Sequence, residues 1–274
     1  MKILVTGSKG FIAKNLIAKL QDHEVLGIDL VDFYNGPDWR SNLATILSKF
    51  GPDVIFHVGA CSDTLEQRVN YMMDLNYEAT KLIAVYSKYL NCKLIYSSSA
   101  ANTGNDGKGP SNLYGWSKYA GEDMACSVGG VALRYFNVYG PGEEHKGRMA
   151  SVAYQAWTKK DEVFNLFPGN PTRDFVYVDD IVKANLHALE NYEMFQSNYF
   201  DVGSGESRSF EDVLNLMGIK YTHLAEEVVP DGYQFFTVSN TNEWLPGWKP
   251  DHTIDTGIPA YLEYLNKLDT NESN

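Results

Sequence analysis

The chain has 274 residues, enough to bury a full core, which favours one large domain with an appended lobe. Its formal net charge of -12 excludes a broad positive surface for nucleic acid or an anionic membrane, so an anionic small molecule would need locally gathered cations. Cys61, Cys92 and Cys126 are widely spaced without a CxxC pair, which predicts neither disulfides nor a metal site and favours a reducing cytoplasm. We find no basic leader and no apolar run of membrane-spanning length.

Short apolar runs, rich in β-branched residues, alternate with longer amphipathic runs along most of the chain. This alternation predicts an α/β fold of the Rossmann type, in which helices cover both faces of a doubly wound parallel sheet. Ligands bind such sheets at the carboxyl ends of the strands. We predict strands at 2–6, 25–29, 53–58, 93–99, 131–138 and 199–202, and helices at 11–21, 42–50, 68–91, 113–127 and 178–191.

The alternation loosens after Gly140, which predicts a smaller, discontinuous C-terminal substrate lobe. We assign residues 1–140 and 174–203 to a dinucleotide-binding domain, and 141–173 and 204–274 to the substrate lobe. The predicted helix at 68–91 has a main apolar face through Met72, Leu75, Ala79, Leu82 and Tyr86. It also has a weaker second face through Met73, Tyr77 and Ala84, which indicates a subunit contact and hence a homodimer or higher homo-oligomer.

A glycine-rich turn joins the first predicted strand to the first helix. Gly7 permits a tight turn, Gly10 lets a pyrophosphate approach the backbone, and Ala13 lets the helix pack closely on the sheet. Asp29 ends the next strand, where a carboxylate binds the ribose hydroxyls of a dinucleotide. Asp29 repels a phosphate on that ribose and so favours NAD, although Lys9 and Arg40 are close enough in sequence to keep NADP possible.

Tyr114 and Lys118 are spaced to lie on one face of a predicted helix, and Ser99 ends a predicted strand. A nearby cation and an oxidised nicotinamide would both favour the phenolate of Tyr114, which would make it a base beside a hydride acceptor. Ser99 would hydrogen-bond the same substrate oxygen. Each pattern alone is commoner as a surface pair or a turn, but their order after a dinucleotide turn predicts a catalytic set.

Beyond these motifs, further stretches resemble the extended short-chain dehydrogenase/reductase family, the NAD-dependent nucleotide-sugar epimerases and dehydratases. They are His57-Val58-Gly59-Ala60, Arg134 to Pro141, Arg173 to Asp180 and Asp201 to Gly205. Within that family, Gly59 to Thr64, Tyr71 to Tyr77 and His145 to Ala153 resemble the ADP-heptose 6-epimerases. The resemblance implies a nucleotide-sugar epimerase that oxidises the sugar transiently to a ketone and reduces it again.

The resemblance also implies roles for individual residues. Lys146 falls on the second acid/base of the heptose epimerases, and Arg173 would bind the nucleotide diphosphate through its planar guanidinium. Asp38 and Trp39 would lie near the adenine. The remaining implied cofactor contacts are Lys9, Phe11, Ile12, Val58, Gly59, Ala60, Tyr135, Asn137 and Val138, and the remaining implied substrate contacts are Ser62, Asn137, Arg148 and Tyr233, with no metal.

Other activities stay open at this stage. A 4,6-dehydratase would need an acidic pair after Ser99, where Ala100 and Ala101 stand. A UDP-sugar 4-epimerase, a nucleotide-sugar reductase or dehydrogenase, and a cofactor-binding protein without catalysis are the remaining alternatives. The segment 101–113 is short and carries Thr103 where the family usually has tyrosine, so the sequence does not name the sugar, the base or the carbon that reacts.

Overall fold

The larger lobe is built on a parallel sheet. The computed structural model describes residues 1–104, 108–225, 229 and 233–272. Six parallel strands lie in the order β2-β1-β3-β4-β5-β9, so the order reverses between β1 and β3 and creates a ligand-binding crevice at their carboxyl ends. The strands are β1 (Lys2–Thr6), β2 (Glu24–Ile28), β3 (Val54–His57), β4 (Lys93–Ser99), β5 (Val131–Tyr135) and β9 (Tyr199–Val202).

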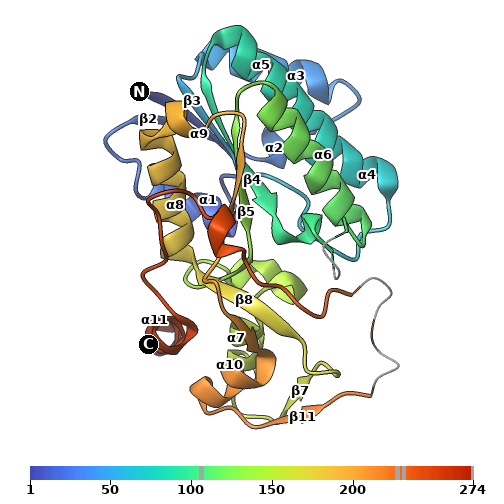
Figure 1. Cartoon of the computed structure of the whole chain (residues 1–274), viewed down its shortest axis with the longest axis vertical. Helices are drawn as coiled ribbons and strands as arrows, with labels where there is room; N and C mark the ends of the chain where they lie inside the picture. Colours follow the sequence, from blue (N-terminus) through green and yellow to red (C-terminus); the bar gives the residue numbers. More distant parts are fainter. Residues whose placement is uncertain (105–107, 226–228, 230–232, 273–274) are drawn as a thin grey trace.

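Helices cover both faces of this sheet (Figure 1). Side chains of β1 alternate between the faces: Ile3 and Val5 pack in one apolar cluster and Leu4 in the other. The predicted doubly wound α/β fold is therefore confirmed. One face carries α1 (Phe11–Ile17), α8 (Val178–Glu190) and α9 (Tyr192–Phe195), and the other carries α2 (Leu30–Phe33), α3 (Trp39–Phe50), α4 (Val69–Met73), α5 (Ala79–Leu90) and α6 (Leu113–Ser127).

The helix predicted at 68–91 is not continuous, because a π-helical turn, η1 (Asp74–Glu78), separates α4 from α5. A π-helical turn holds more residues than an α-helical turn, so it rotates the faces of everything that follows. The fully buried side chains of α5 are therefore centred on Ile83 and Ala84, and the predicted core residue Leu82 lies half-buried against the same cluster. Ala84 is fully buried, so its predicted place on a second, exposed apolar face is wrong.

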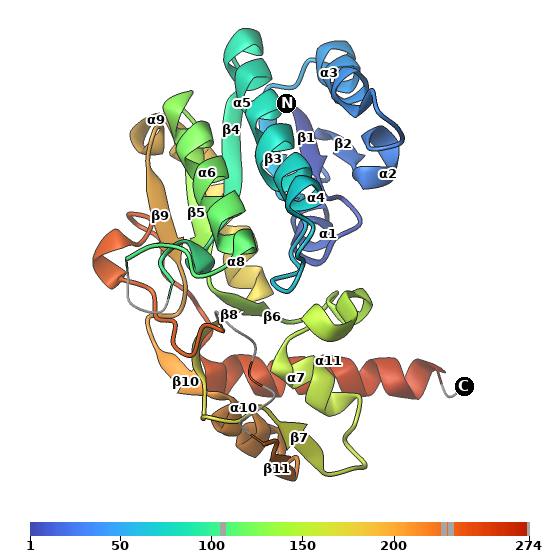
Figure 2. The same cartoon turned by 90° about the vertical axis from the view of Figure 1, so that its right-hand side faces the viewer.

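The smaller lobe packs below the sheet, and α11 runs across it (Figure 2). Its core joins the strands β6 and β8 to the helices α10 and α11. Two short sheets, β10-β8-β6 and β11-β7, complete it. Its elements are β6 (Asn137–Tyr139), η3 (Glu144–Met149), α7 (Val152–Trp157), β7 (Phe164–Leu166), β8 (Thr172–Tyr177), β10 (Ser207–Ser209), α10 (Phe210–Met217), β11 (Tyr221–His223) and α11 (Ile254–Glu272), while the 3₁₀ turns η2 (Ala100–Asn102) and η5 (Thr241–Glu243) lie beside the larger sheet.

The chain crosses between the lobes more often than the sequence indicates. The strand predicted at 131–138 breaks at Phe136, so β5 belongs to the large sheet and β6 to the small one. Leu245 and Trp248, predicted in the substrate lobe, pack in the core of the larger lobe. The domain boundaries stay a prediction. Within the described ranges, no helix combines the length and apolarity that crossing a membrane requires.

Candidate active site

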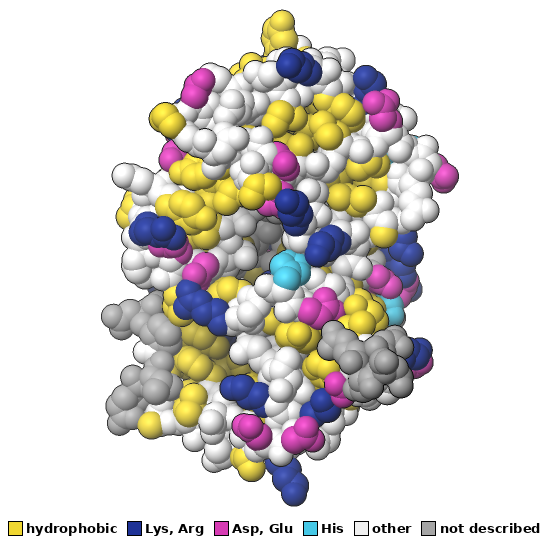
Figure 3. Space-filling model, turned by 180° about the vertical axis from the view of Figure 1, so that it is seen from behind, with side chains coloured by type: hydrophobic (Ala, Val, Ile, Leu, Met, Phe, Trp, Pro, Cys, Tyr) yellow, Lys and Arg dark blue, Asp and Glu magenta, His cyan; other side chains and the backbone are white. Residues whose placement is uncertain are grey.

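Two adjoining cavities lie at the junction of the lobes. Their volumes are about 540 and 600 Å³, and Tyr114 and Lys146 line both. From behind, the molecule shows a hollow at mid-height with histidine and Lys or Arg side chains at its edge (Figure 3). The first cavity follows the ends of β1, β2 and β3, and the second extends into the smaller lobe.

The glycine turn forms one end of the first cavity. Gly7 has φ +66°, and a Cβ added there would lie 2.6 Å from the Cα of Gly59. A Cβ on Gly10 would lie 2.9 Å from the carbonyl oxygen of Gly7. Both positions therefore require glycine, and their backbone stays open to a pyrophosphate group.

A directed chain of hydrogen bonds supports this turn from below. The Gly59 N–H donates to Thr6 Oγ1 at 2.9 Å, and Thr6 Oγ1 lies 2.7 Å from His57 Nδ1. On its other side, His57 Nε2 lies 2.8 Å from Thr80 Oγ1, which donates to the carbonyl of Asn76 at 2.7 Å. Burial, and secondarily the Lys118 charge, lowers the pKa of His57 to about 3. The imidazole is therefore neutral, and it positions neighbouring groups instead of transferring protons.

Asp29 is held at the edge of the first cavity. Its carboxylate accepts hydrogen bonds from the backbone N–H of Lys9 at 2.9 Å and of Leu30 at 2.7 Å. Asp32 closes the capping box by accepting from the Asp29 N–H at 2.6 Å. This geometry presents fixed negative charge where the sequence predicts ribose binding.

Asp38 and Trp39 line neither of the two cavities, and their predicted contact with the adenine stays a prediction. Trp39 is 3% exposed and packs against Phe33 and Tyr34. Arg40 stacks on Trp39 and pairs with Asp74 at 3.0 Å.

The predicted catalytic trio converges on the wall between the cavities. The Ser99 hydroxyl favours the phenolate of Tyr114, but burial outweighs this effect and raises the pKa of Tyr114. Lys118 is 2% exposed, and its Nζ lies 4.2 Å from the centre of the Tyr96 ring. Burial lowers the pKa of Lys118 to about 7, and the charge of Glu122 opposes this shift. Lys118 is thus poised to lose its proton unless a partner stabilises the charge.

Two buried polar groups hold α6 in place. Asn76 of η1 donates to Ser117 Oγ at 2.9 Å and bonds both backbone groups of Cys61. Glu122 accepts from Arg134 of β5 at 2.6 and 2.8 Å and from Ser98 of β4 at 2.6 Å. The helix with Tyr114 is therefore tied to the strands at the wall.

The opposite wall is the loop η3. Lys146 Nζ lies 5.3 Å from the centre of the Phe11 ring, and burial lowers the pKa of Lys146. Arg148 forms an ion pair with Asp63 of the larger lobe. The loop thus places two cations at the junction of the lobes.

The second cavity has an aromatic wall. Tyr233 stacks on Phe167 with ring centres 4.3 Å apart, and Asn137 lines the wall nearby. Arg173 lies behind the wall: its guanidinium is 5.2 Å from the Tyr233 ring and donates to the Thr172 carbonyl at 2.9 Å. Burial lowers the pKa of Arg173.

Most of the predicted contacts line the two cavities. Asp38, Trp39 and Arg173 line neither. The predicted residues on the first cavity are Gly7, Lys9, Gly10, Phe11, Ile12, Asp29, Val58, Gly59, Ala60, Ser62, Tyr114, Lys118, Tyr135 and Lys146. Those on the second are Ile12, Ser62, Ser99, Tyr114, Tyr135, Asn137, Val138, Lys146, Arg148 and Tyr233.

Comparison with known proteins identifies the family. The model of the NAD dependent epimerase/dehydratase family matches residues 3–203. The chain belongs to this family. The ADP-L-glycero-D-manno-heptose-6-epimerase of Brachyspira hyodysenteriae is 34% identical over 313 aligned positions, which cover 97% of this chain and 98% of the relative.

Solved structures agree with this family. The Helicobacter pylori ADP-L-glycero-D-manno-heptose-6-epimerase superposes with a TM-score of 0.81 at 27% identity, covering 97% of this chain and 96% of that one. A UDP-glucuronic acid 4-epimerase from Bacillus cereus, solved with UDP-glucuronic acid and NAD, has a TM-score of 0.79 at 23% identity and shares the fold, covering 98% and 100% of the two chains.

The family makes the chain an NAD-dependent enzyme, as the sequence predicts. The site fits NAD, because a side chain at Gly7 or Gly10 would fill the cradle and Asp29 offers a fixed carboxylate beside it. The roles of the individual residues stay predictions.

Sequence reasoning missed several residues that shape the site. His57, Asn76 and Glu122 are buried polar side chains, and only the fold shows which groups they contact. The acidic residue four positions after Lys118 was the one available signal for Glu122. Nothing in the sequence distinguishes the aromatic residues of the second cavity, such as Phe167, from core residues.

Proposed function

We propose that this chain epimerises a nucleotide-linked sugar by oxidising one carbinol carbon to a ketone and reducing it from the opposite face. The observation that carries the proposal is that Tyr114 of the larger lobe and Lys146 of the smaller lobe both line the two adjoining cavities. Reduction of one ketone from either face needs a proton donor on each side. A reductase that works on one face of the ketone needs only one proton donor.

In this mechanism, NAD held at the glycine turn and Asp29 would supply the hydride acceptor and, later, the hydride donor. Tyr114 takes the proton of the substrate hydroxyl, and Ser99 holds the same oxygen. In the structure, Tyr114 keeps its proton at neutral pH because burial raises its pKa. The charge of Lys118 favours the phenolate when substrate is bound, and an oxidised nicotinamide in the first cavity would add to this effect. Lys146 then supplies the proton at the other face.

We propose an ADP-linked heptose as the substrate, with epimerisation at exocyclic C6. The support is the resemblance of two heptose 6-epimerases over nearly the whole chain, together with the cations Lys146 and Arg148 at the cavities. An exocyclic carbonyl can turn between the two donors without rotating the whole sugar. A UDP-sugar 4-epimerase is the second candidate, because structures with that activity share the fold.

The test is incubation with a panel of nucleotide sugars that includes ADP-heptose and UDP-glucose, followed by NMR of the recovered sugar. We expect inversion at C6 of the heptose without net consumption of cofactor. Inversion at C4 of a UDP-sugar would favour the second candidate, and stoichiometric NADH turnover would indicate a reductase or dehydrogenase. If the protein binds NAD but no sugar changes the redox state of the cofactor, the chain is a cofactor-binding protein without catalysis.

We propose that NAD is preferred to NADP. Asp29 and Asp32 place negative charge at the expected ribose site, and Arg40 is paired with Asp74 at 3.0 Å and Glu78 at 3.5 Å. A 2′-phosphate would meet repulsion there without a free partner in Arg40. Equal dissociation constants for the two cofactors would contradict this.

We further propose a cytoplasmic homo-oligomer. Exposed apolar side chains gather on α5 and α6, including Val85, Tyr89, Trp116 and Tyr119. A patch on neighbouring helices suits a contact between copies of the chain. Light scattering after size exclusion tests this, and a monomer at micromolar concentration would contradict it.

A further inference from the structure

Glu143 is a buried carboxylate at the base of the Lys146 loop. It has no exposed surface, and it accepts hydrogen bonds from the Ser151 N–H at 2.5 Å, the Ser151 hydroxyl at 2.7 Å and the Gly140 N–H at 3.3 Å. Gly140 follows β6, and Ser151 caps α7. One side chain therefore ties together the two ends of the loop.

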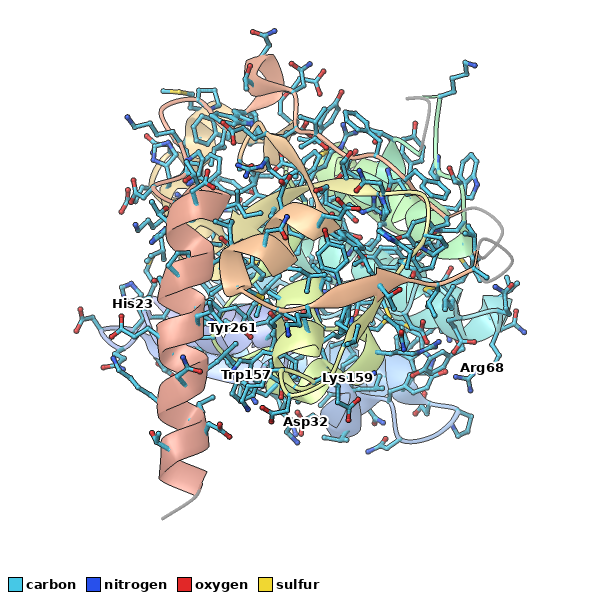
Figure 4. All side chains as sticks on the ribbon, turned by 90° about the horizontal axis from the view of Figure 1, so that it is seen from below. His23, Asp32, Arg68, Trp157, Lys159 and Tyr261 are labelled. Atoms are coloured by element: carbon cyan, nitrogen blue, oxygen red, sulfur yellow. The ribbon has the colours of Figure 1, made fainter. Side chains whose placement is uncertain are left out.

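The helix α11 closes this site from the other side. Tyr261 is 1% exposed and lies on the α11 face that is turned toward the body of the molecule (Figure 4). Burial, and after it the Glu143 charge, raises the pKa of Tyr261. The adjacent Tyr264 hydroxyl donates to Glu144 at 3.0 Å. Glu144 thus docks the loop on α11, and Glu143 lies close enough to Tyr261 for its charge to act on that phenol.

The same carboxylate acts on the charge of Lys146. Burial lowers the pKa of Lys146, and the negative charge of Glu143 is the interaction that opposes this. Conversely, burial raises the pKa of Glu143, while the Ser151 hydrogen bonds and the Lys146 charge favour its ionised form. Lys146 and Tyr261 are the ionisable groups that face Glu143 from its own loop and from α11.

We infer that Glu143 is a positioning residue for Lys146: by fixing both ends of the loop, it places the ammonium at the wall shared by the cavities. In addition, its negative charge favours the charged form of that ammonium. The inference rests on the proposed function, in which Lys146 donates a proton. It is distinct from that function because it can be measured without turnover.

The first experiment measures Lys146 directly in the full chain. Lysines are reductively methylated with ¹³C, the Lys146 resonance is identified by its loss in Lys146→Met, and it is titrated by NMR. We expect Glu143→Gln to move the Lys146 titration to lower pH by about one unit, because a neighbouring opposite charge is lost. Glu144→Gln is the matched control and should leave the midpoint in place. An unchanged midpoint in Glu143→Gln would overturn the charge role.

The second experiment tests the positioning role by turnover. Glu143→Asp keeps the charge but shortens the reach to Ser151, so it should lower kcat severalfold with the Lys146 midpoint unchanged. Wild-type kcat in this variant would overturn the positioning role. Because Glu143→Asp carries its own outcome, the inference stays testable if Glu143→Gln fails to fold. Should Lys146→Met keep full turnover, the proposed function loses its second donor, yet the NMR titration still decides the charge role.

Discussion

The two walls of the site are built in different ways. Tyr114 and Lys118 stand on a regular helix tied to the parallel sheet by Asn76 and Glu122, whereas Lys146 stands on an irregular loop with Gly147 at φ +54°. The first wall is fixed by periodic secondary structure. The second depends on a few side chains, above all Glu143, and on packing against α11. A proton-transferring side chain can therefore be positioned either by regular secondary structure or by a few local side-chain contacts.

Loss of the Tyr114 phenol should give the largest effect on turnover. It tests whether the first wall supplies the group that transfers the proton. We expect Tyr114→Phe to lower kcat by about a thousandfold, because general acid–base groups contribute about 10²–10⁴-fold. NAD affinity should stay within about twofold of wild type in a fluorescence titration, since the ring remains. Tyr119→Phe, on the exposed side of the same helix, is the control. Substantial turnover by Tyr114→Phe would refute the assignment.

Breaking the frame of the first wall should cost stability. Glu122 and Arg134 form a buried, bidentate ion pair, so Glu122→Gln leaves the guanidinium with only the longer, partly exposed ion pair to Glu243 at 3.9 Å. We expect a loss of about 3–5 kcal/mol in the free energy of unfolding, measured with urea. Adding Arg134→Met should recover part of this loss. A change below about 1 kcal/mol would mean that the scaffold does not depend on the pair.

Removing the Lys146 ammonium from the second wall should separate the oxidation of the substrate from the reduction of the ketone. We expect Lys146→Met to slow epimerisation by about a hundredfold while the first oxidation, seen as NADH absorbance on adding one epimer, persists. Tyr114→Phe should lose both epimerisation and NADH formation. The exposed Lys159→Met serves as control. Loss of NADH formation in Lys146→Met, with the fold intact, would mean that both walls serve one face of the carbonyl.

The smallest expected effect lies outside both walls. Burial raises the pKa of Asp201 to about 6, against opposing contributions from the Asn240 N–H and Arg134. The folded protein thus binds this proton more tightly than the unfolded chain does, so the stability penalty is present above pH 6 and disappears as the pH falls through 6 toward 4. Asp201→Asn should gain about 1 kcal/mol at pH 7.5 and flatten this slope in thermal unfolding. An unchanged pH dependence would contradict the shift.

The contrast between the walls also explains what the sequence could predict. Strands such as 93–99 and the helix at 113–127 follow from local periodicity, and their bounds match the structure. The π-helical turn at Asp74–Glu78 does not follow from local periodicity, because tertiary hydrogen bonds through Asn76 favour it over a regular α-helical turn. The core position of Trp39 also depends on contacts with distant residues. Glu143 has no sequence signal, since its partners, two backbone N–H groups and the Ser151 hydroxyl, meet it only through the folded shape of the loop.

The hydrogen-bond chain from Gly59 to Asn76 has one further consequence. The Asn76 carbonyl can only accept and the Gly59 N–H can only donate, so the proton on His57 must sit on Nε2, and each hydroxyl in the chain points one way. Rotating any single hydroxyl would leave a buried donor facing a donor. The glycine cradle and the π-helical turn thus share one proton arrangement, and neither can rearrange its hydrogen bonds alone.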